Sequence, residues 1–169
     1  SLEFTKYEGI GNDFIILDGR LPYIDRLFSS KKVLVKDLCN RNTGIGSDGI
    51  ILLRRSKSNN IGRMDIYNSD GTVAEMCGNG FRCLVKFIEE QTDINLPDDF
   101  TIETLAGDIE ANITFNGEVR VNMGVPSFLP ANIPTTLDLC QSELPSESII
   151  LDGISMTIYA SGMGNPHMV

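Results

Sequence analysis

Apolar and polar residues alternate, or gather in short apolar runs, along most of the chain, and this pattern is typical of β-strands. Turn sequences separate neighbouring runs, among them Asn116-Gly117 and Asp152-Gly153, which favour tight hairpins. The pattern predicts strands over residues 4–7, 14–18, 50–53, 64–67, 100–104, 109–115, 119–123, 149–151 and 156–159.

Helical periodicity is strongest over residues 79–91. The apolar positions there form a broad arc, which suits a helix surrounded by other elements better than one on a surface. They are Phe81, Leu84, Val85, Phe87 and Ile88. A weaker helix is predicted over residues 31–40, with Ser29 or Ser30 as its cap.

Strands therefore outnumber helices, and the turns between them are mostly hairpin turns. A doubly wound fold needs a helix between successive strands, so this pattern predicts an α+β fold in which a mostly antiparallel β-barrel wraps around the central helix. Repeats, low-complexity tracts and linker-like shifts in composition are absent from the sequence. We therefore expect residues 1–169 to form one domain.

Composition and charge limit the function classes. The chain has 169 residues, enough for an ordinary core, and 14 Lys and Arg against 23 Asp and Glu give a net charge of −9. This charge disfavours nucleic acids and anionic membrane surfaces as partners. Apolar runs stay well below the ~20 residues of a membrane span, and the start lacks signal-peptide features. We expect a soluble cytoplasmic protein, or one of the plastid stroma after processing.

Metal and disulfide chemistry are not predicted. A single histidine, His167, excludes sites that need two, and the four cysteines include no C-x-x-C pair. Cys77 and Cys83 would lie about 9 Å apart along a helix, too far for a disulfide. For Cys39, Cys83 and Cys140 we favour the role of small buried apolar residues.

A glycine-rich segment over residues 44–49 matches G-x-G-x-x-G, the pattern of dinucleotide-binding loops. Such a loop leaves a strand and opens a helix, whereas this segment follows a helix and enters a strand. We therefore interpret its glycines as turn formers.

The segment Met76-Cys77-Gly78-Asn79-Gly80 differs, because it stands directly before the best helix. Free N–H groups at a helix start favour the thiolate of a neighbouring cysteine and can bind a carboxylate. Gly78 and Gly80 would let a substrate approach the backbone. From these residues alone a catalytic Cys77 and a purely structural helix cap are equally acceptable.

Neutral amides recur in the glycine-rich turns, at Asn12, Asn68, Asn79 and Asn165. Each alone is more often a turn residue than a ligand. Together with one thiol and few nearby charges, they suit a small zwitterion held by hydrogen bonds.

These residues lie in six segments through which the chain resembles the diaminopimelate epimerase family along nearly its whole length. The segments are Phe4-Thr5-Lys6-Tyr7 through Gly11-Asn12-Asp13-Phe14, Arg41-Asn42-Thr43-Gly44-Ile45-Gly46-Ser47-Asp48-Gly49, Tyr67-Asn68-Ser69-Asp70-Gly71, Met76-Cys77-Gly78-Asn79-Gly80-Phe81-Arg82-Cys83, Arg120-Val121-Asn122-Met123-Gly124 and Met163-Gly164-Asn165-Pro166-His167. They occur in the family's order.

The resemblance implies two similar halves, each a β-barrel around a central helix, with the active site between them. Residues 1–169 look like the N-terminal half, and the C-terminal domain would be the partner. The implied activity is epimerisation of LL-diaminopimelate to meso-diaminopimelate in lysine biosynthesis. Two cysteines would act as acid and base without pyridoxal phosphate or another cofactor.

For the site, the resemblance implies that Cys77 is one of these cysteines and that His167 tunes its thiol. The residues implied to hold the substrate are Asn12, Asn68, Gly78, Asn79 and Asn165. Glu8 stands where many members have histidine, and Gly49 where some have a substrate-contacting glutamine, so no role is carried over to either.

The second cysteine is missing from the chain, which we therefore expect to be inactive alone. Two alternatives stay open. One is a related amino-acid racemase of the same superfamily, and the other is a non-catalytic binding domain with an inert Cys77. A homodimer also stays open as an assembly.

Overall fold

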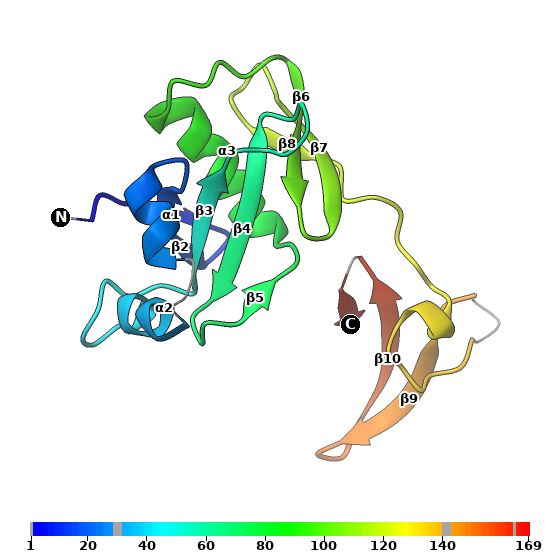
Figure 1. Ribbon diagram of the computed structural model, residues 1–169. Coiled ribbons are helices and arrows are strands. Elements are labelled where there is room, and N and C mark those ends of the chain that lie inside the picture. Colours follow the sequence, from blue (N-terminus) through cyan, green and yellow to red (C-terminus); the bar gives the residue numbers. More distant parts are fainter. Residues whose placement is uncertain (1, 29–31, 140–142, 164) are drawn as a thin grey trace. The chain divides into compact units, whose positions relative to one another are not determined.

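The computed structural model describes residues 2–28, 32–139, 143–163 and 165–169, and most of its strands belong to one sheet (Figure 1). The chain divides into a larger unit, Ser1–Asn122, and a smaller unit, Met123–Val169. The division falls just before the proline-rich segment around Pro126 and Pro130.

The larger unit has an eight-stranded sheet in the order β1-β2-β3-β4-β6-β7-β8, with β5 paired to β4. The strands are β1 (Thr5–Gly9), β2 (Asn12–Asp18), β3 (Gly49–Arg54), β4 (Gly62–Asn68), β5 (Val73–Ala74), β6 (Asp99–Thr104), β7 (Gly107–Ile113) and β8 (Val119–Val121). The predicted strands are all present, with ends shifted by a few residues, and β5 is an additional one. Since β1 and β8 end the order without pairing in the described sheet, the barrel is open.

Helix α3 (Gly78–Gln91) is the predicted central helix, and the sheet curves around it (Figure 1). It contacts β1, β2, β3 and β8. Its apolar arc is buried as expected, at Phe81, Leu84, Val85, Phe87 and Ile88. Each such side chain contributes roughly 1.5–3 kcal/mol on burial, so α3 and the inner sheet face form the main core. The α+β fold with a central helix is confirmed.

Two pairs in this sheet are parallel, β2 with β3 and β4 with β6, so the sheet is mixed and only mostly antiparallel. Parallel strands need a long crossover connection. Between β2 and β3 this is supplied by α1 (Pro22–Phe28), which the sequence analysis missed, and α2 (Lys32–Cys39), which it predicted. The proposed caps of α2, Ser29 and Ser30, lie outside the described residues.

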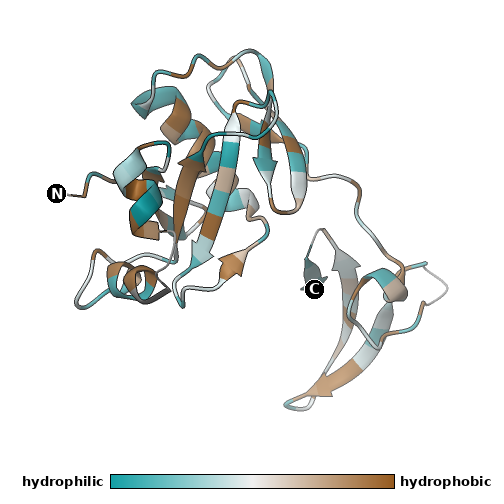
Figure 2. Ribbon diagram, in the orientation of Figure 1, coloured by the Kyte–Doolittle hydropathy of each residue, from teal (hydrophilic) through white to brown (hydrophobic). Residues whose placement is uncertain are grey.

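Burial on both faces explains the parallel pair. Residues Ile15 and Leu17 of β2 pack under α1 and α2, in a second apolar cluster, while Phe14 and Ile16 face α3. Strand β3 is likewise apolar along its length (Figure 2). Continuous apolar runs of this kind are typical of parallel strands covered by helices on both faces.

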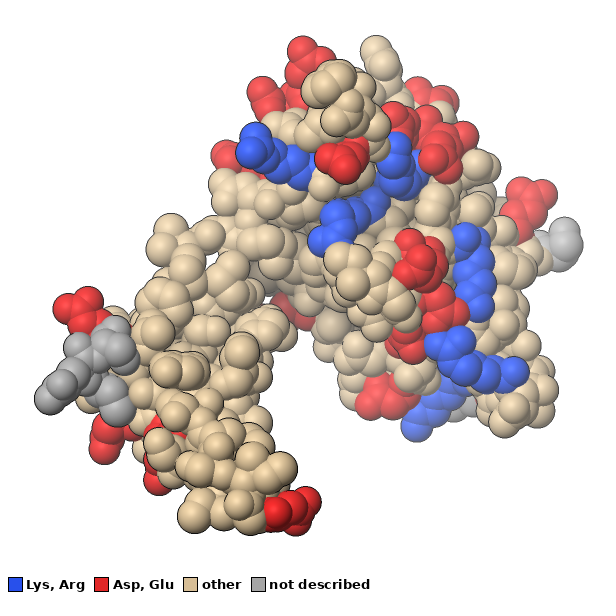
Figure 3. All heavy atoms as spheres, turned by 180° about the vertical axis from the view of Figure 1, so that it is seen from behind, with Lys and Arg blue, Asp and Glu red and all other residues tan. Residues whose placement is uncertain are grey.

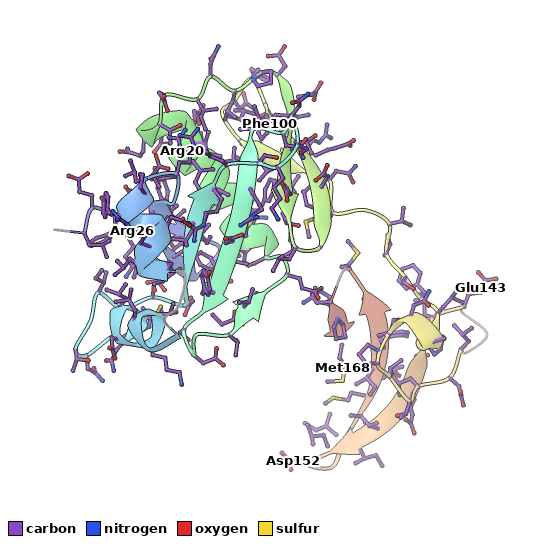
Figure 4. All side chains as sticks on the ribbon, in the orientation of Figure 1. Arg20, Arg26, Phe100, Glu143, Asp152 and Met168 are labelled. Carbon is purple, nitrogen blue, oxygen red and sulfur yellow. The ribbon has the colours of Figure 1, made fainter. Side chains whose placement is uncertain are left out.

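The smaller unit is a three-stranded sheet of β9 (Ser146–Leu151), β10 (Ile154–Gly162) and β11 (Pro166–Met168), in the order β11-β10-β9. The predicted hairpin at Asp152-Gly153 is present, and Asp152 marks its tip (Figure 4). A short 3-10 helix, η1 (Pro130–Asn132), precedes Ile133, which is buried.

Charge is divided unequally between the units. All 14 Lys and Arg precede residue 123, and the smaller unit carries only four acidic side chains. Figure 3 shows the blue Lys and Arg atoms on the larger unit, interleaved with acidic ones. Among the described residues, no helix is long and apolar enough to cross a membrane.

Candidate active site at the start of helix α3

Cys77 is the N-cap of α3. Its backbone is extended (φ −147°, ψ 115°), its carbonyl accepts the N–H of Phe81 at 2.8 Å, and its Sγ accepts the N–H of Gly80 at 3.5 Å. The sequence places it there because Gly78 and Gly80 favour a turn before the apolar arc begins. The thiol therefore lies at the positive end of the helix dipole, half-buried.

The helix start also offers backbone donors beside this thiol. The first N–H groups of an α-helix, those of Gly78 and Asn79 here, have no carbonyl one turn earlier. A carboxylate can bind at such a terminus. The predicted contact of Gly78 with a substrate stays a prediction. Gly80 instead faces the core, because a Cβ there would lie 2.8 Å from Ile51 Cδ1, and this corrects its predicted role beside a substrate.

Asn12 and Asn79 are 67 residues apart in the sequence and meet in the folded larger unit. Asn79 Nδ2 donates to Asn12 Oδ1 at 2.8 Å, joining the start of β2 to the first turn of α3. Both side chains are half-buried. Two of the predicted amides therefore contact each other at the first turn of the helix that Cys77 caps.

Charged side chains extend this pair at both ends. The Arg82 guanidinium donates to Asn79 Oδ1, and Asn12 Nδ2 donates to Asp48 Oδ2 at 3.3 Å. Asp48 Oδ2 also accepts the backbone N–H of Asp13 at 3.1 Å. The result is a continuous hydrogen-bonded chain from α3 to the loop before β3.

An ion-pair cluster holds that loop. Arg41 contacts Asp13 and Asp48, while Lys6 contacts Asp13 at 2.7 Å and the carbonyl of Gly46 at 2.6 Å. The Arg41 guanidinium bound to Asp13 holds the pKa of that carboxyl well below its usual range. The cluster therefore keeps Asp13 ionised and fixes the loop that carries Asp48.

The glycine-rich segment over residues 44–49 is a helix C-terminal turn, as interpreted from the sequence. The N–H groups of Ile45 and Gly46 both donate to the carbonyl of Leu38, at 2.9 and 3.0 Å, and so close the end of α2. At Gly49 a Cβ would lie 2.5 Å from the carbonyl oxygen of Tyr67, so a side chain there requires the strands to move.

Asn68 is placed at the end of β4, in an exposed turn. Its Nδ2 donates to Thr72 Oγ1 at 3.0 Å and its backbone N–H to the Thr72 carbonyl at 2.8 Å. No hydrogen bond among the described residues joins it to the Asn12–Asn79 pair. Its predicted contact with a substrate stays a prediction.

Asn165 and His167 lie in the smaller unit, where His167 Nε2 and Asn165 Oδ1 are 3.0 Å apart. Both are exposed, on or beside β11. The predicted action of His167 on the Cys77 thiol also stays a prediction.

The other described cysteines, Cys39 and Cys83, are buried and free, as predicted. Burial raises the pKa of Cys83 to about 11 and also raises that of Cys39, whose Sγ lies 3.2 Å from Ser47 Oγ. Cys77 is the least buried of the three and the one at a helix start. Cys140 lies outside the described residues.

Two hollows in the larger unit lie away from the thiol. One of about 400 Å³ opens beside Asp48 and is lined by Lys36, Arg41 and Ser69 among others, and a larger one covers β6, β7 and β8. Neither lining includes Cys77. Among the described residues, no group of three or more His, Cys, Asp or Glu is placed to hold a metal.

Sequence reasoning missed Arg82, Asp48 and Arg41. Arg82 stands three residues after Asn79 on a helix, a spacing at which side chains meet, so this contact could have been found. The contact of Asp48 with Asn12 could not, because it depends on how the loop returns to β2. Glu8, for which no role was predicted, accepts the N–H of Gly11 and so closes the turn between β1 and β2.

Comparison with known proteins identifies relatives of this chain. The model of the diaminopimelate epimerase family matches residues 4–129. A diaminopimelate epimerase of Prochlorococcus marinus is 48% identical over 167 residues, covering 98% of this chain and 59% of the relative. Diaminopimelate epimerase 1 of a Nostoc species is 38% identical, over 100% of this chain and 60% of the relative. The chain thus spans about three fifths of the length of these relatives.

Solved structures agree on the fold. A probable proline racemase from Agrobacterium radiobacter superposes with a TM-score of 0.63 at 18% identity, over 95% of this chain and 49% of its own. A PhzF-family phenazine biosynthesis protein from Bacillus anthracis gives 0.62 at 18% identity, over 98% and 54%. With the family match over most of its length, the chain belongs to the diaminopimelate epimerase family.

Proposed function

We propose that this chain is the N-terminal half of a cofactor-independent diaminopimelate epimerase, with Cys77 as one of two acid/base cysteines. The observation that carries the proposal is the half-buried Cys77 thiol at the start of α3, beside free backbone N–H groups and the Asn12–Asn79 pair. The reaction converts LL-diaminopimelate to meso-diaminopimelate, a step of lysine biosynthesis.

The chemistry needs a base on one face of the α-carbon and an acid on the other. The Cys77 thiolate removes the α-proton, or its thiol delivers one in the reverse direction, while a second thiol performs the opposite transfer. The electron pair left on carbon delocalises into the substrate carboxylate. Donors aimed at that carboxylate, such as the N–H groups of Gly78 and Asn79, stabilise the developing charge.

Neutral amides hold the rest of the substrate in this proposal. Asn12, Asn68, Gly78 and Asn79 come from the larger unit, and Asn165 from the smaller. His167 tunes the thiol of Cys77 in this proposal. The amide of Asn165 already contacts His167 and would fix the orientation of its ring.

The second thiol belongs to the remaining two fifths of the length of the relatives. The sheet of the smaller unit leaves large apolar side chains exposed, with Leu151, Ile154 and Met168 57%, 64% and 72% exposed, as is typical of a surface that a further part of a protein covers. We propose that residues 1–169 form the N-terminal domain of a two-domain enzyme, and that this enzyme is cytoplasmic.

The test is Cys77→Ala in the complete protein, with Cys83→Ala as the matched control. We expect Cys77→Ala to slow epimerisation by about 10²–10⁴-fold, the usual contribution of a positioned acid or base. Conversion of LL-diaminopimelate to meso-diaminopimelate, followed by chiral chromatography, measures it, because the second thiol alone could still exchange the α-proton. Cys83 is buried in the same helix, so its variant reports any loss of stability. Retained activity in Cys77→Ala would refute the catalytic role.

A second candidate is a racemase for another amino acid, favoured by the structural likeness to a probable proline racemase. A substrate panel separates the two, with LL-diaminopimelate, proline and hydroxyproline compared by α-proton exchange. Exchange of proline alone would support the racemase.

A non-catalytic binding domain is tested by chemical reactivity. In that case iodoacetamide should alkylate Cys77 no faster than an ordinary exposed cysteine at any pH, and substrate should not protect it. Selective alkylation of Cys77 over Cys39 and Cys83, blocked by diaminopimelate, supports the epimerase instead.

A further inference from the structure

We propose that Arg82 and Asp48 are positioning residues, which together fix the direction in which the Asn12 and Asn79 amides point. The inference rests on the proposed function only for its kinetic consequence. Its structural basis is the chain of hydrogen bonds that runs from Arg82 through Asn79 and Asn12 to Asp48.

This chain of hydrogen bonds has a direction, because the residue at one end can only donate and the residue at the other end can only accept. A guanidinium has donors only, so the atom of Asn79 facing Arg82 must be Oδ1. An ionised carboxylate has acceptors only, so the atom of Asn12 facing Asp48 must be Nδ2. Between them, Asn79 Nδ2 then meets Asn12 Oδ1 as donor and acceptor, at 2.8 Å.

Either end alone is enough to set this direction. With Arg82 removed, Asp48 still orients Asn12, and Asn12 Oδ1 then orients Asn79. With the charge at Asp48 removed, Arg82 orients Asn79, and Asn79 Nδ2 orients Asn12. Only the loss of both ends lets the two amides flip together. Arg82 and Asp48 are therefore redundant as orienting residues, and only the loss of both should change the direction of the amides.

The consequence for a bound substrate is a fixed set of donors. Each Nδ2 uses one N–H within the chain, and among the described residues the second N–H of each makes no hydrogen bond. Both spare donors lie near the start of α3. A flipped pair would turn oxygens toward the positions that these donors now occupy, and substrate acceptors would then meet acceptors.

Asp48 is itself held by other contacts, which gives the test a control. Arg41 Nη2 donates to Asp48 Oδ1 at 2.9 Å and also contacts Asp13, and the N–H of Asp13 donates to Asp48 Oδ2. The Asp13 carboxylate shares Arg41 with Asp48, but it does not contact either amide side chain. Asp13→Asn therefore perturbs the same ion-pair cluster without changing the chain of hydrogen bonds from Arg82 to Asp48.

The experiment is a pair of double-mutant cycles in the complete protein. Asp48→Asn is isosteric, whereas Arg82→Gln shortens the side chain; both remove a charge, and each new amide can donate or accept. Two equally populated directions would leave about half of the double variant competent to bind, so we expect it to raise KM about twofold beyond the product of the singles. Each single variant should change KM little, and kcat should change little in all three. The cycle of Arg82→Gln with Asp13→Asn should show no excess over its product.

A second readout needs no substrate. Solvent exchange of the side-chain amide protons of Asn12 and Asn79, followed by ¹⁵N NMR in the same proteins, should accelerate at least about tenfold in the Arg82→Gln/Asp48→Asn double variant only. Multiplicative KM effects together with unchanged exchange would overturn the proposal. Accelerated exchange without a KM effect would leave the positioning intact and count against the proposed function.

Discussion

The larger and the smaller unit are both built from hairpins with alternating apolar residues, yet among the residues that the structure describes an α-helix packs against the sheet only in the larger one. In the larger unit α3 covers the inner face, and Phe81 and Leu84 are fully buried. In the smaller unit directly opposed residues such as Leu151 and Ile154 share a face and stay exposed. The same strand pattern thus gives a packed core only where a helix completes it.

The two units also differ in their charged residues. The larger unit combines 14 Lys and Arg with 19 acidic residues (23 − 4), and several of them form the cluster around Asp13 and Arg41. The smaller unit has acidic side chains but no Lys or Arg to pair with them. Internal packing and ion pairs both mark the larger unit as the one that holds its own structure, and the thiol stands on its central helix.

Removing one leucine from each unit is the strongest test of this contrast. Leu84→Ala leaves a cavity between α3 and the sheet, and should lower the free energy of unfolding by about 2–5 kcal/mol. Leu151→Ala removes an exposed side chain and should change it by less than about 0.5 kcal/mol. Urea unfolding of the 169-residue chain measures both. A Leu151→Ala cost near that of Leu84→Ala would mean that the smaller unit packs its own core.

Substitution of one glycine in each unit tests the same difference in packing, with a smaller expected change in the free energy of unfolding. At Gly44 a Cβ would lie 2.0 Å from the carbonyl oxygen of Asp37, so Gly44→Ala must move the end of α2 and should cost about 3 kcal/mol. At Gly153, in the hairpin of the smaller unit, φ is +78° but no atom lies within 4 Å of a Cβ. Gly153→Ala should therefore cost only the backbone strain, about 1 kcal/mol. Equal costs in the same unfolding experiment would contradict this assignment.

Local patterns were sufficient to predict much of the fold. The alternating runs predicted the strands, the arc from Phe81 to Ile88 predicted the central helix, and the glycines around Cys77 predicted where that helix begins. In each case the cause lies within a few residues of its effect. The crossover through α1 was not predicted, because Pro22–Phe28 is too short to show a helical period.

The site was predicted less completely, for the same physical reason. Cys77, Gly78 and Asn79 are neighbours in sequence, and their grouping could be seen directly. The approach of Asn12 to Asn79 spans 67 residues, and the approach of Asp48 to Asn12 spans 36. Such contacts depend on strand order, which no local pattern encodes.

The turn between β1 and β2 offers a stabilising change in the larger unit. Ile10 and Gly11 form its two central residues, both with positive φ (52° and 83°), and Ile10 is 83% exposed. A β-branched residue is strained there, whereas Asn-Gly is favoured. Ile10→Asn should raise the free energy of unfolding by about 1 kcal/mol.

The equivalent turn position in the smaller unit is the control for that change. Asp152 already has a tolerated side chain at φ 51°, so Asp152→Asn should leave stability nearly unchanged. Thermal unfolding monitored by circular dichroism compares the two variants. Destabilisation by Ile10→Asn would show that Ile10 makes contacts that outweigh its backbone strain.

The smallest expected effect is the pH dependence that the ion pairs give to the larger unit. Arg41 holds the pKa of Asp13 below its usual range in the folded chain, whereas in the unfolded chain an ordinary value near 3.9 applies. A lowered folded pKa stabilises the fold above the unfolded pKa, and this contribution is lost as pH falls through the folded pKa. Stability should therefore decline as pH falls below about 4, and Asp13→Asn should flatten that decline. Because Arg41 is exposed and solvent screens the pair, the change is small.

Urea midpoints at closely spaced pH values measure this decline in stability, and Arg41→Gln should flatten the curve in the same way. If the slope of Asp13→Asn equals that of the unaltered chain, carboxylates outside this cluster set the acid sensitivity.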